Sequence, residues 1–427
     1  MLYHLFDWLK EEGIRFPGMD LFRFITFRTL MAVLLSLFIT LVYGKKLIKY
    51  LQARQFSEGV RDLGLAGENH KKDTPTMGGI IILVAILLPT LLLANLSKVY
   101  VQLMLISTVW LGAIGFIDDY LKLRGKQKAL SLGLDHKKSG SDGLAGRFKI
   151  IGQVVLGVIV GATLYFNSEV KIWRQYIGTP QVAAADSNVI VKNVNGQSKY
   201  FVETKTPITT IPFVKNHEFN YSKLLPASLR SYDWLLYILV VIFIITAVSN
   251  GANLTDGLDG LATGTSALIG VLLGIFAYAS GNLVIADYLN IMYIPNLGEL
   301  SVFIAAMIGA CIGFLWYNSY PAQIFMGDTG SLTLGGIIAA LAIIVHKELL
   351  IPIFCGVFLV EALSVMLQVG YFKFTKRKYG TGRRIFLTAP IHHHFQKLGF
   401  HEVKIVNRFW IVTVLLVLLS IVTLKIR

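Results

Sequence analysis

The sequence predicts an all-α protein that crosses a membrane about ten times and carries a small β-rich insertion on its outer side. Of its 427 residues, 54% are hydrophobic and only 15% are charged, which is more apolar than a soluble core of this length needs. Windows of roughly 20 apolar residues, the length that crosses a bilayer, recur along the chain. The ten windows begin near Phe22, Gly78, Val101, Phe148, Trp234, Gly260, Leu300, Leu332, Leu349 and Val406.

The N-terminal region and the two cysteines show no sign of processing or of a cysteine framework. Residues 1 to 23 lack the basic, apolar and small-residue regions of a cleaved signal peptide, so we expect the first span to be retained. Cys311 and Cys355 each lie inside an apolar window, without the spacing of a zinc site or a disulfide framework. We interpret both as packing residues.

The net charge of +15 is best explained by the orientation of the spans and not by nucleic-acid binding. Ten spans divide the loops into two alternating sets. Loops 44–77, 119–147, 250–260, 317–328 and 372–405 hold seven, seven, none, none and eight Lys or Arg, whereas the short loops of the other set hold at most one each. The positive-inside rule therefore places the first set in the cytoplasm and both termini outside.

The segment from Asn167 to Asp233 is a long connection on the outer side. Its eight Lys or Arg do not decide the topology, because long loops are translocated largely regardless of charge. Alternating polar and apolar residues, with Asn195-Gly196 as a hairpin signal, predict short strands. We therefore treat residues 1–427 as a single transmembrane domain with an extracytoplasmic insertion over 167–232, and we expect this insertion to be dispensable for chemistry on the other side.

Five polar motifs interrupt the apolar pattern, and all five lie in the loops assigned to the cytoplasm. The two loops without cations carry the acids Asp256, Asp259 and Asp328, a separation of charge that solvation alone does not explain. The motifs are "KKDTPTMGG" (71–79), "DDYLKLRGK" (118–126), "NGANLTDGLDG" (250–260), "NSYPAQIFMGDTGS" (318–331) and "APIHHHFQKLGF" (389–400).

Adjacent Asp118 and Asp119 follow directly on an apolar window. A plain helix end does not favour two anions there, because the C-terminal end of a helix dipole is itself negative. The pair needs a cation, which a divalent metal or the following Lys122 and Lys126 would supply. We therefore interpret the pair as part of a binding site.

Asp256 and Asp259 stand three residues apart beside glycines, at the predicted start of the span near Gly260. This spacing places both on one side of a first helical turn, which Asn253 or Thr255 would cap. Ordinary helix-start chemistry is one interpretation of the acids. The repeated Asp-Gly pairs favour another, because glycine leaves the backbone open to close approach by a ligand.

Asp328 lies between a glycine and a threonine, just before another apolar window. Mg²⁺ prefers oxygen ligands, usually one or two carboxylates completed by water and substrate phosphates. Asp328 together with Asp118, Asp119, Asp256 or Asp259 would form such a site. An acidic N-cap for the span that follows is the alternative.

Three consecutive histidines, His392 to His394, lie in a loop rich in Lys and Arg. Zinc is the weakest interpretation, because consecutive side chains diverge and no Cys lies nearby. A solvated loop is the second, and contacts to an anionic phosphoryl ligand are the third and the one that the surrounding cations favour. The sequence contains no Walker A loop, so it gives no support to ATP hydrolysis as an energy source.

As an ordered set, "TPTMGG", "GFIDDYLK", "NLTDGLDG", "FMGDTGSL" and "APIHHHF" resemble the motifs of the phospho-N-acetylmuramoyl-pentapeptide transferase family of bacterial cell-wall synthesis. The resemblance implies Mg²⁺-dependent transfer from UDP-N-acetylmuramoyl-pentapeptide to undecaprenyl phosphate, giving lipid I and UMP. It implies a multi-pass catalytic domain in the bilayer of the bacterial inner membrane, with its active site facing the cytoplasm and no nucleic-acid partner. It leaves a homodimer open.

The resemblance also carries roles to individual positions. Asp328 matches the family's Mg²⁺ ligand, and Asp118 and Asp119 match its catalytic pair; we count all three as catalytic. Phe325 matches an aromatic residue that stacks on uracil. The other substrate-binding positions that it implies are Asn253, Asp256 and Asp259 in the nucleoside loop, and Lys71, Thr76, Lys122, Lys126, Asn318, Gln368, His392, His393 and His394 along the cleft.

Two alternatives stay open from the sequence. A related polyprenyl-phosphate N-acetylhexosamine-1-phosphate transferase would share the aspartates, although "IHHHF" favours the muramoyl-pentapeptide donor. An ion-coupled transporter would also place acids in apolar spans. Transporter sites tend to lie near the midplane, however, whereas these acids gather at span ends on one side.

Overall fold

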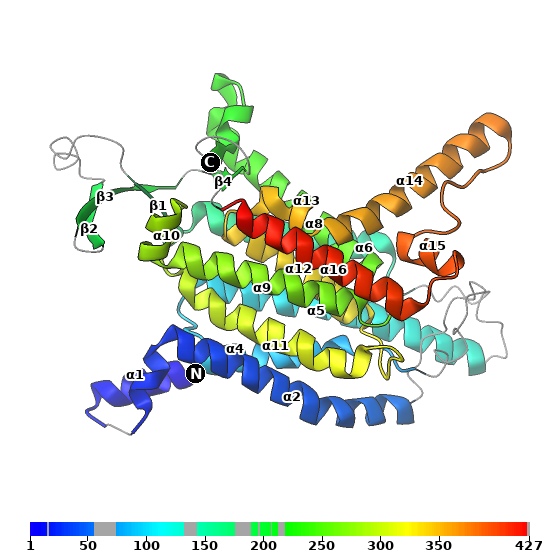
Figure 1. Cartoon of the computed structure of the whole chain (residues 1–427), viewed down its shortest axis with the longest axis horizontal. Helices are drawn as coiled ribbons and strands as arrows, with labels where there is room; N and C mark the ends of the chain where they lie inside the picture. The colour runs from blue at the N-terminus through cyan, green and yellow to red at the C-terminus, as the bar shows by residue number, and fades with distance from the viewer. Residues whose placement is uncertain are drawn as a thin grey trace.

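The computed structural model places apolar helices side by side at every position where the sequence predicts a span (Figure 1). It describes residues 1–14, 17–54, 74–131, 143–175, 189–194, 197–205, 207–211 and 218–424, so Lys71 of the first motif lies outside the described residues. The all-α transmembrane architecture is confirmed.

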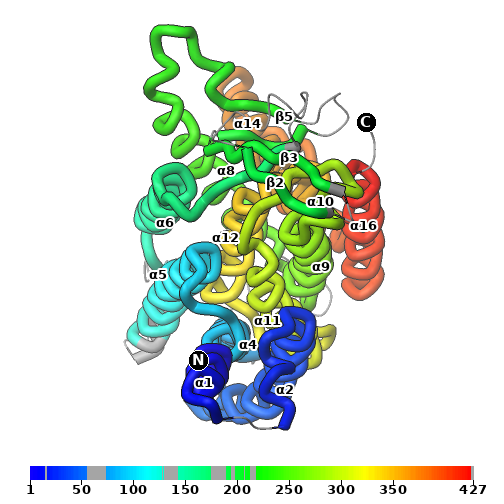
Figure 2. The backbone as a smooth tube through the Cα atoms, turned by 90° about the vertical axis from the view of Figure 1, so that its left-hand side faces the viewer, coloured from blue at the N-terminus to red at the C-terminus, as the bar shows by residue number. Residues whose placement is uncertain are grey.

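Within that part of the chain, nine helices are long and apolar enough to cross a membrane, and the 15-residue α4 lies among them. In chain order the ten are α2 (Ile25–Ala53), α4 (Gly79–Leu93), α5 (Val99–Ser131), α6 (Gly146–Phe166), α8 (Asp233–Thr255), α9 (Leu261–Gly281), α11 (Leu300–Asn318), α12 (Gly327–Ile344), α14 (Gly356–Tyr379) and α16 (Glu402–Val422). Figure 2 shows α9, α11 and α12 near the centre, and these three helices are also the most deeply buried. Both cysteines are buried and free, as expected for packing residues.

Shorter helices lie at the ends of the bundle. They are α1 (Leu2–Glu11), η1 (Met19–Arg23), η3 (Tyr221–Leu224), η4 (Ala227–Tyr232), α10 (Leu283–Leu289), η5 (Leu297–Glu299), η6 (Glu348–Leu350), α13 (Ile351–Phe354) and α15 (Ile391–Lys397). Figure 1 places α15 beside α14 at the end of the bundle opposite to α10. This arrangement separates the polar motifs from the outer ends of the spans.

The span predicted from Leu332 begins earlier, at Gly327. Asp328 therefore lies in the first turn of α12 and not in the loop before it. The span predicted from Leu349 is broken: α13 ends at Phe354, and α14 begins at Gly356. Figure 1 shows α14 leaning away from the other helices after this break.

The expectation that Asp256 and Asp259 share the first turn of a helix is wrong. Helix α8 ends at Thr255 and α9 begins at Leu261, so both acids lie in the turn between the two helices. Gly260 has φ of +78°, a left-handed conformation that strains residues with a Cβ. The glycines of this motif thus shape a turn, which periodicity alone does not reveal.

A buried ion pair lies at the end of the bundle opposite to the polar motifs. Arg28 on α2 donates to both carboxylate oxygens of Glu299, at 2.7 and 2.5 Å, and to the carbonyl oxygen of Leu93 at 3.1 Å. The N–H of Asn95 donates to Glu299 Oε2 at 3.1 Å. Because an unpaired buried charge is costly, these contacts hold the ends of α2, α4 and η5 together.

The insertion is β-rich, as predicted. Strands β1 (Ile172–Gln175), β2 (Val189–Val194) and β3 (Gln197–Thr204) form an antiparallel sheet in the order β1-β3-β2, and β4 (Ile208–Thr210) pairs with β5 (Glu218–Asn220). Val194 pairs with Gln197, which gives a two-residue connection between β2 and β3. The predicted turn residues, Asn195 and Gly196, lie outside the described residues.

The insertion is attached to the loop between α12 and α13, where His346, Lys347 and Glu348 are all buried. The N–H of Thr210 donates to His346 O at 3.2 Å, and its Oγ1 accepts from Lys347 Nζ at 2.8 Å. The hydroxyl of Tyr221 donates to Glu348 Oε1 at 2.9 Å. Burial lowers the pKa of Lys347 to about 8 and raises the pKa of Glu348 to about 7. The insertion therefore supplies polar contacts that these buried groups need.

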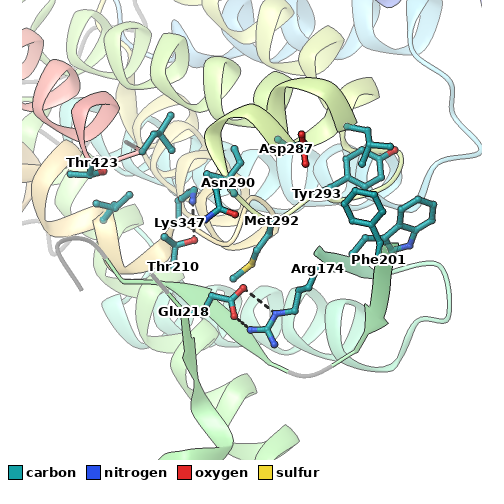
Figure 3. A pocket seen from close by; sticks show the side chains of 16 residues that line it. Arg174, Phe201, Thr210, Glu218, Asp287, Asn290, Met292, Tyr293, Lys347 and Thr423 are labelled. Carbon is teal, nitrogen blue, oxygen red and sulfur yellow. Dashed lines mark hydrogen bonds and ion pairs between the residues drawn. The ribbon is translucent and has the colours of Figure 1, made fainter. Parts of the chain in front are cut away.

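A cavity of about 310 Å³ lies between the insertion, α10 and this loop (Figure 3). Two acids line it, and each has its own cation: Arg174 Nε donates to Glu218 Oε1 at 3.0 Å, and Lys199 Nζ donates to Asp287 Oδ2 at 2.5 Å. These pairs join strands of the insertion to one another and to α10. The cavity lies at the end of the bundle opposite to the polar motifs.

These contacts predict that the insertion contributes to stability even though it lies far from the motifs. Replacing Tyr221 by Phe leaves the buried carboxylate of Glu348 without its hydroxyl donor, so we expect the free energy of unfolding to fall by about 1–3 kcal/mol. The midpoint of thermal unfolding in detergent measures this loss, with Tyr232→Phe, an exposed tyrosine, as the control. Equal midpoints for both variants would contradict the anchoring role.

Candidate active site

Three aspartates from two helices meet at the end of the bundle that carries the polar motifs. Asp118 and Asp119 on α5 are 0% and 1% exposed, and Asp328 on α12 is 8% exposed. Carboxylate oxygens of all three lie within 4.8 Å of one another. The structure therefore brings together three of the acids that the sequence singled out, and they could hold a metal ion.

Close packing of α5 against the start of α12 makes this meeting possible. A Cβ on Gly115 would collide with the backbone of Asp328, so a larger residue here would force the helices apart. Gly327 has φ of +72°, and its position next to Asp119 leaves little space for a side chain. These two glycines let the N-terminus of α12 point directly at α5.

Asp119 caps the N-terminus of α12 from the neighbouring helix. Its Oδ1 accepts from the N–H of Asp328 at 3.0 Å. Its Oδ2 accepts from the N–H of Thr329 at 2.9 Å and from Thr329 Oγ1 at 2.6 Å. An anion at a helix N-terminus satisfies free N–H groups and complements the dipole. Both oxygens of Asp119 are thus engaged in holding α12.

Asp118 lies among cations. Lys122 and Lys149 each place Nζ 2.9 Å from Asp118 Oδ2, and the N–H of Leu144 donates to Asp118 Oδ1 at 2.7 Å. The alternative of a plain helix end does not hold, because α5 continues to Ser131. The continuing turn of α5 places Lys122 beside Asp118, and the cations come from α5 and α6.

Lys149 is a site residue that our sequence analysis missed. Its Nζ forms an ion pair with Asp328 Oδ2 as well as with Asp118, and Lys122 Nζ lies 3.4 Å from the same oxygen of Asp328. Two lysines thus bridge carboxylates of α5 and α12. The available signal was a lysine inside an apolar span, where charged residues are rare and usually functional.

Asn253, in the last turn of α8, contacts the carboxylate cluster. Its Nδ2 donates to Asp328 Oδ1 at 2.9 Å and to Ser331 Oγ at 2.9 Å. The hydroxyl of Thr255 donates back to Gly251 O at 2.8 Å, so neither residue caps α9 as the sequence suggested. Asp256 follows directly and is partly exposed at the end of α8. Asn253 is therefore the residue of this motif that touches the cluster.

The first and fourth motifs pair along their backbones. Phe325 N–H donates to Pro75 O at 2.8 Å, and Phe325 O accepts from Gly78 N–H at 2.9 Å. The pairing places Thr76 against Gly327, and Phe325 remains partly exposed. Thr76 Oγ1 is buried and has no hydrogen-bond partner among the described residues.

Three of the predicted substrate-binding residues are engaged in bracing loops. Asn318 accepts from the N–H of Gly260 and from Thr263 Oγ1, both at 3.1 Å, and donates to Ile324 O at 2.9 Å. Asp259 Oδ2 accepts from Ala322 N–H at 3.0 Å. Gln368 Oε1 accepts from the N–H groups of Ile385 and Phe386, both at 3.0 Å. None of these bonds reaches the three clustered aspartates. Lys126 lies one turn beyond Lys122 on α5.

The three histidines have different surroundings on α15. His392 is fully buried, with Nδ1 3.0 Å from Glu361 Oε2 of α14. His393 is partly exposed and pairs its Nδ1 with Gln396 Oε1 at 2.7 Å. His394, also partly exposed, accepts through Nδ1 from Leu387 N–H at 3.2 Å. The sequence did not distinguish these three positions.

The chain is similar to known proteins along its whole length. The chain matches the model described as "Glycosyl transferase family 4" over residues 141–346 and "Phospho-N-acetylmuramoyl-pentapeptide-transferase signature 1" over residues 71–83. Relatives named phospho-N-acetylmuramoyl-pentapeptide-transferase align with it over 100% of both chains. Those of Flavobacterium psychrophilum, Parabacteroides distasonis and Porphyromonas gingivalis strain W83 are 55%, 54% and 49% identical to it over 430, 445 and 446 residues.

The position of Lys149 predicts a large effect of a small change. In Lys149→Gln the cluster loses one of its two bridging cations, and we expect kcat to fall by about 10²-fold, as for the loss of one electrostatic contact to developing charge. The measurement is product formation by purified, folded protein. Arg147→Gln is the matched control, because Arg147 lies on the same helix but is exposed. Similar kcat values for the two variants would remove Lys149 from the site.

Proposed function

We propose that this chain, which belongs to the phospho-N-acetylmuramoyl-pentapeptide-transferase family and forms lipid I in peptidoglycan synthesis, takes UDP-N-acetylmuramoyl-pentapeptide as donor and undecaprenyl phosphate as acceptor. The observation that carries the proposal is the buried cluster of three aspartates bridged by Lys122 and Lys149. Such a cluster suits a reaction in which both the donor and the acceptor carry phosphate groups.

The reaction exchanges one phosphoanhydride for another. An oxygen of the acceptor phosphate forms a bond to the phosphorus that carries the sugar, while the bond from that phosphorus to the UMP oxygen breaks and UMP leaves with the bonding electrons. The exchange needs no further energy source. The protein has to position the two phosphates and neutralise their charge.

The donor set of the cluster fits Mg²⁺, which prefers oxygen ligands and one or two carboxylates. Asp328 would hold it, together with water and substrate phosphates, because both oxygens of Asp119 already bind α12. When bound, Mg²⁺ supplies positive charge to the phosphate oxygens and polarises a phosphoryl group. Asp119 then serves as a positioning residue for Asp328.

Lys122 and Lys149 would neutralise the phosphates of the bound substrates. Both now contact carboxylates at the edge of the cluster, and their flexible side chains can transfer these contacts to phosphate oxygens. Lys126 lies one turn further along α5 and extends the positive surface. Asp118, which the two lysines face, is the candidate base that holds the proton of the acceptor phosphate.

The donor's nucleoside and sugar would contact the motifs around the cluster. Phe325 is partly exposed and is the candidate stacking surface for uracil. Asn253 donates to Asp328 of the cluster, Asp256 is partly exposed in the turn after α8, and His393 and His394 are partly exposed on α15. Thr76 offers an unused hydroxyl, and Lys71 of the same motif remains a candidate by its matched position.

We also propose that the cluster faces the cytoplasm of a bacterial inner membrane. The chain is a multi-pass membrane protein, and three of the five loops assigned to the side of the cluster are rich in Lys and Arg. The whole chain, 1–427, would act as one catalytic domain, with residues 167–232 as its outer insertion. The acceptor would enter laterally from the bilayer.

Asp328→Asn tests the metal role. Loss of this carboxylate removes a charge that a divalent ion needs, so we expect Mg²⁺-dependent release of UMP to fall at least about 10³-fold, equivalent to about 4 kcal/mol of transition-state stabilisation. Asp20→Asn, at an exposed acid, is the control. Near-normal UMP release by folded Asp328→Asn protein would exclude the metal assignment.

His393→Ala tests the donor side of α15. Removing one hydrogen bond to a charged phosphate costs about 1.5–3 kcal/mol, so we expect kcat/KM for the UDP-linked donor to fall by at least about tenfold. The KM for undecaprenyl phosphate should change little. Both constants are measured in the same detergent, and a variant with normal donor kinetics but a raised acceptor KM would move the histidines to the acceptor side.

A further inference from the structure

Glu361 is a buried acid that the proposed mechanism does not use. It lies in the second turn of α14, a helix apolar enough to cross a membrane, and its side chain is fully buried. An acid in such a helix is rare, and its presence usually has a functional reason. The buried residues of α14 are concentrated in its first turns, so Glu361 lies where this helix touches the rest of the bundle.

The contact of Glu361 is His392 on α15. Its Oε2 lies 3.0 Å from His392 Nδ1, and both side chains are 0% exposed. Neither side chain has another hydrogen-bond or ion-pair partner among the described residues, and the 3.0 Å contact itself falls outside hydrogen-bond geometry. Removing one group therefore leaves the other buried with no polar partner.

The opposite edge of the His392 ring presses on the turn after α8. A Cβ on Gly257 would collide with His392 Nε2, so only a glycine allows this approach. The ring leaves no space for a ligand at this edge. His392 is thus enclosed between Glu361 and Gly257, unlike the partly exposed His393 and His394.

The turn that His392 touches leads to the carboxylate cluster. Gly257 directly follows Asp256, and Asn253 donates to Asp328 Oδ1 at 2.9 Å one helical turn earlier. His393 follows His392 in the sequence, and the centroids of their rings are 4.2 Å apart. One buried ring therefore touches the turn that bears Asp256 and the histidine proposed to meet the donor.

We propose that Glu361 is a positioning residue for the donor, which acts by holding His392 as a buried brace between α14 and the turn at Gly257. The inference rests on the proposed function and refines it, because it assigns His392 a bracing role instead of a substrate contact. It also explains the glycine at 257, where any side chain would displace the brace. Asp256 and His393 are the groups whose placement depends on it.

A double-mutant cycle tests this coupling. Glu361→Gln, His392→Gln and the double variant are compared with the native protein, with Ser364→Ala, another buried polar residue of α14, as the control. The readouts are the Kd of the UDP-linked donor measured without acceptor, the KM for undecaprenyl phosphate and the midpoint of thermal unfolding. We expect Glu361→Gln to weaken donor binding by about 10–100-fold, the size of the loss when a residue that orients a metal-binding histidine from behind is removed.

The same change should leave the acceptor KM within about threefold and should have no further effect on donor binding in His392→Gln. The proposal would be overturned if Glu361→Gln weakened donor binding equally in the native protein and in His392→Gln. Normal donor binding by the Glu361→Gln protein would overturn it as well. If Glu361→Gln does not fold, Gly257→Ala displaces the ring from its other edge and should show the same donor defect. Normal donor binding by folded Gly257→Ala would be equally contradictory.

The outcome separates this inference from the proposed function. Native protein that releases no UMP when given donor, undecaprenyl phosphate and Mg²⁺ would contradict the proposed function itself. Active native protein with uncoupled effects at Glu361 and His392 would contradict the positioning role alone.

Discussion

The capping of α12 by Asp119 is the contact on which the rest of the site depends. Three hydrogen bonds from the first residues of α12 end on one carboxylate of α5, and glycines at 115 and 327 give the backbone the space for this approach. The bonds fix the direction in which Asp328 points. Asp118, one residue earlier on α5, then faces Asp328 across the two lysines. A loop could not hold these groups so closely, because it lacks the packing of two long helices.

The charge of the buried cluster is not balanced, which leaves it able to attract a cation. Three carboxylates and two lysines leave the cluster with one negative charge in excess when all are ionised, in surroundings where unpaired charge is costly. A divalent cation would change the balance to net positive, and substrate phosphates would restore it. The proposed function therefore suits this charge balance, whereas the ion pairs at the opposite end of the bundle are already balanced and join helices and strands.

Much of this structure could be predicted from sequence, and the failures have physical reasons. Apolar windows located all ten helices because burial in lipid needs continuous apolar length. Periodicity misplaced Asp256 and Asp259, since Gly260 ends the turn in a conformation that composition does not encode. Lys149 was missed because it stands alone between apolar residues, with no motif around it. Glu361 was missed for the same reason, and its partner His392 comes from a distant segment. Asp328 could be singled out because its motif is local, and the structure places it in the aspartate cluster.

The central claim is that Asp119 acts by holding α12, whereas Asp118 and Asp328 act on the substrates. The most direct measurement is the single-turnover rate of Asp119→Asn, Thr329→Val and the double variant, all with saturating donor and acceptor. Thr329→Val should slow the native protein but have little further effect on Asp119→Asn, because both changes break the same cap. Fully additive losses would rule out this role, since they would mean that Asp119 contributes to the chemistry independently of α12.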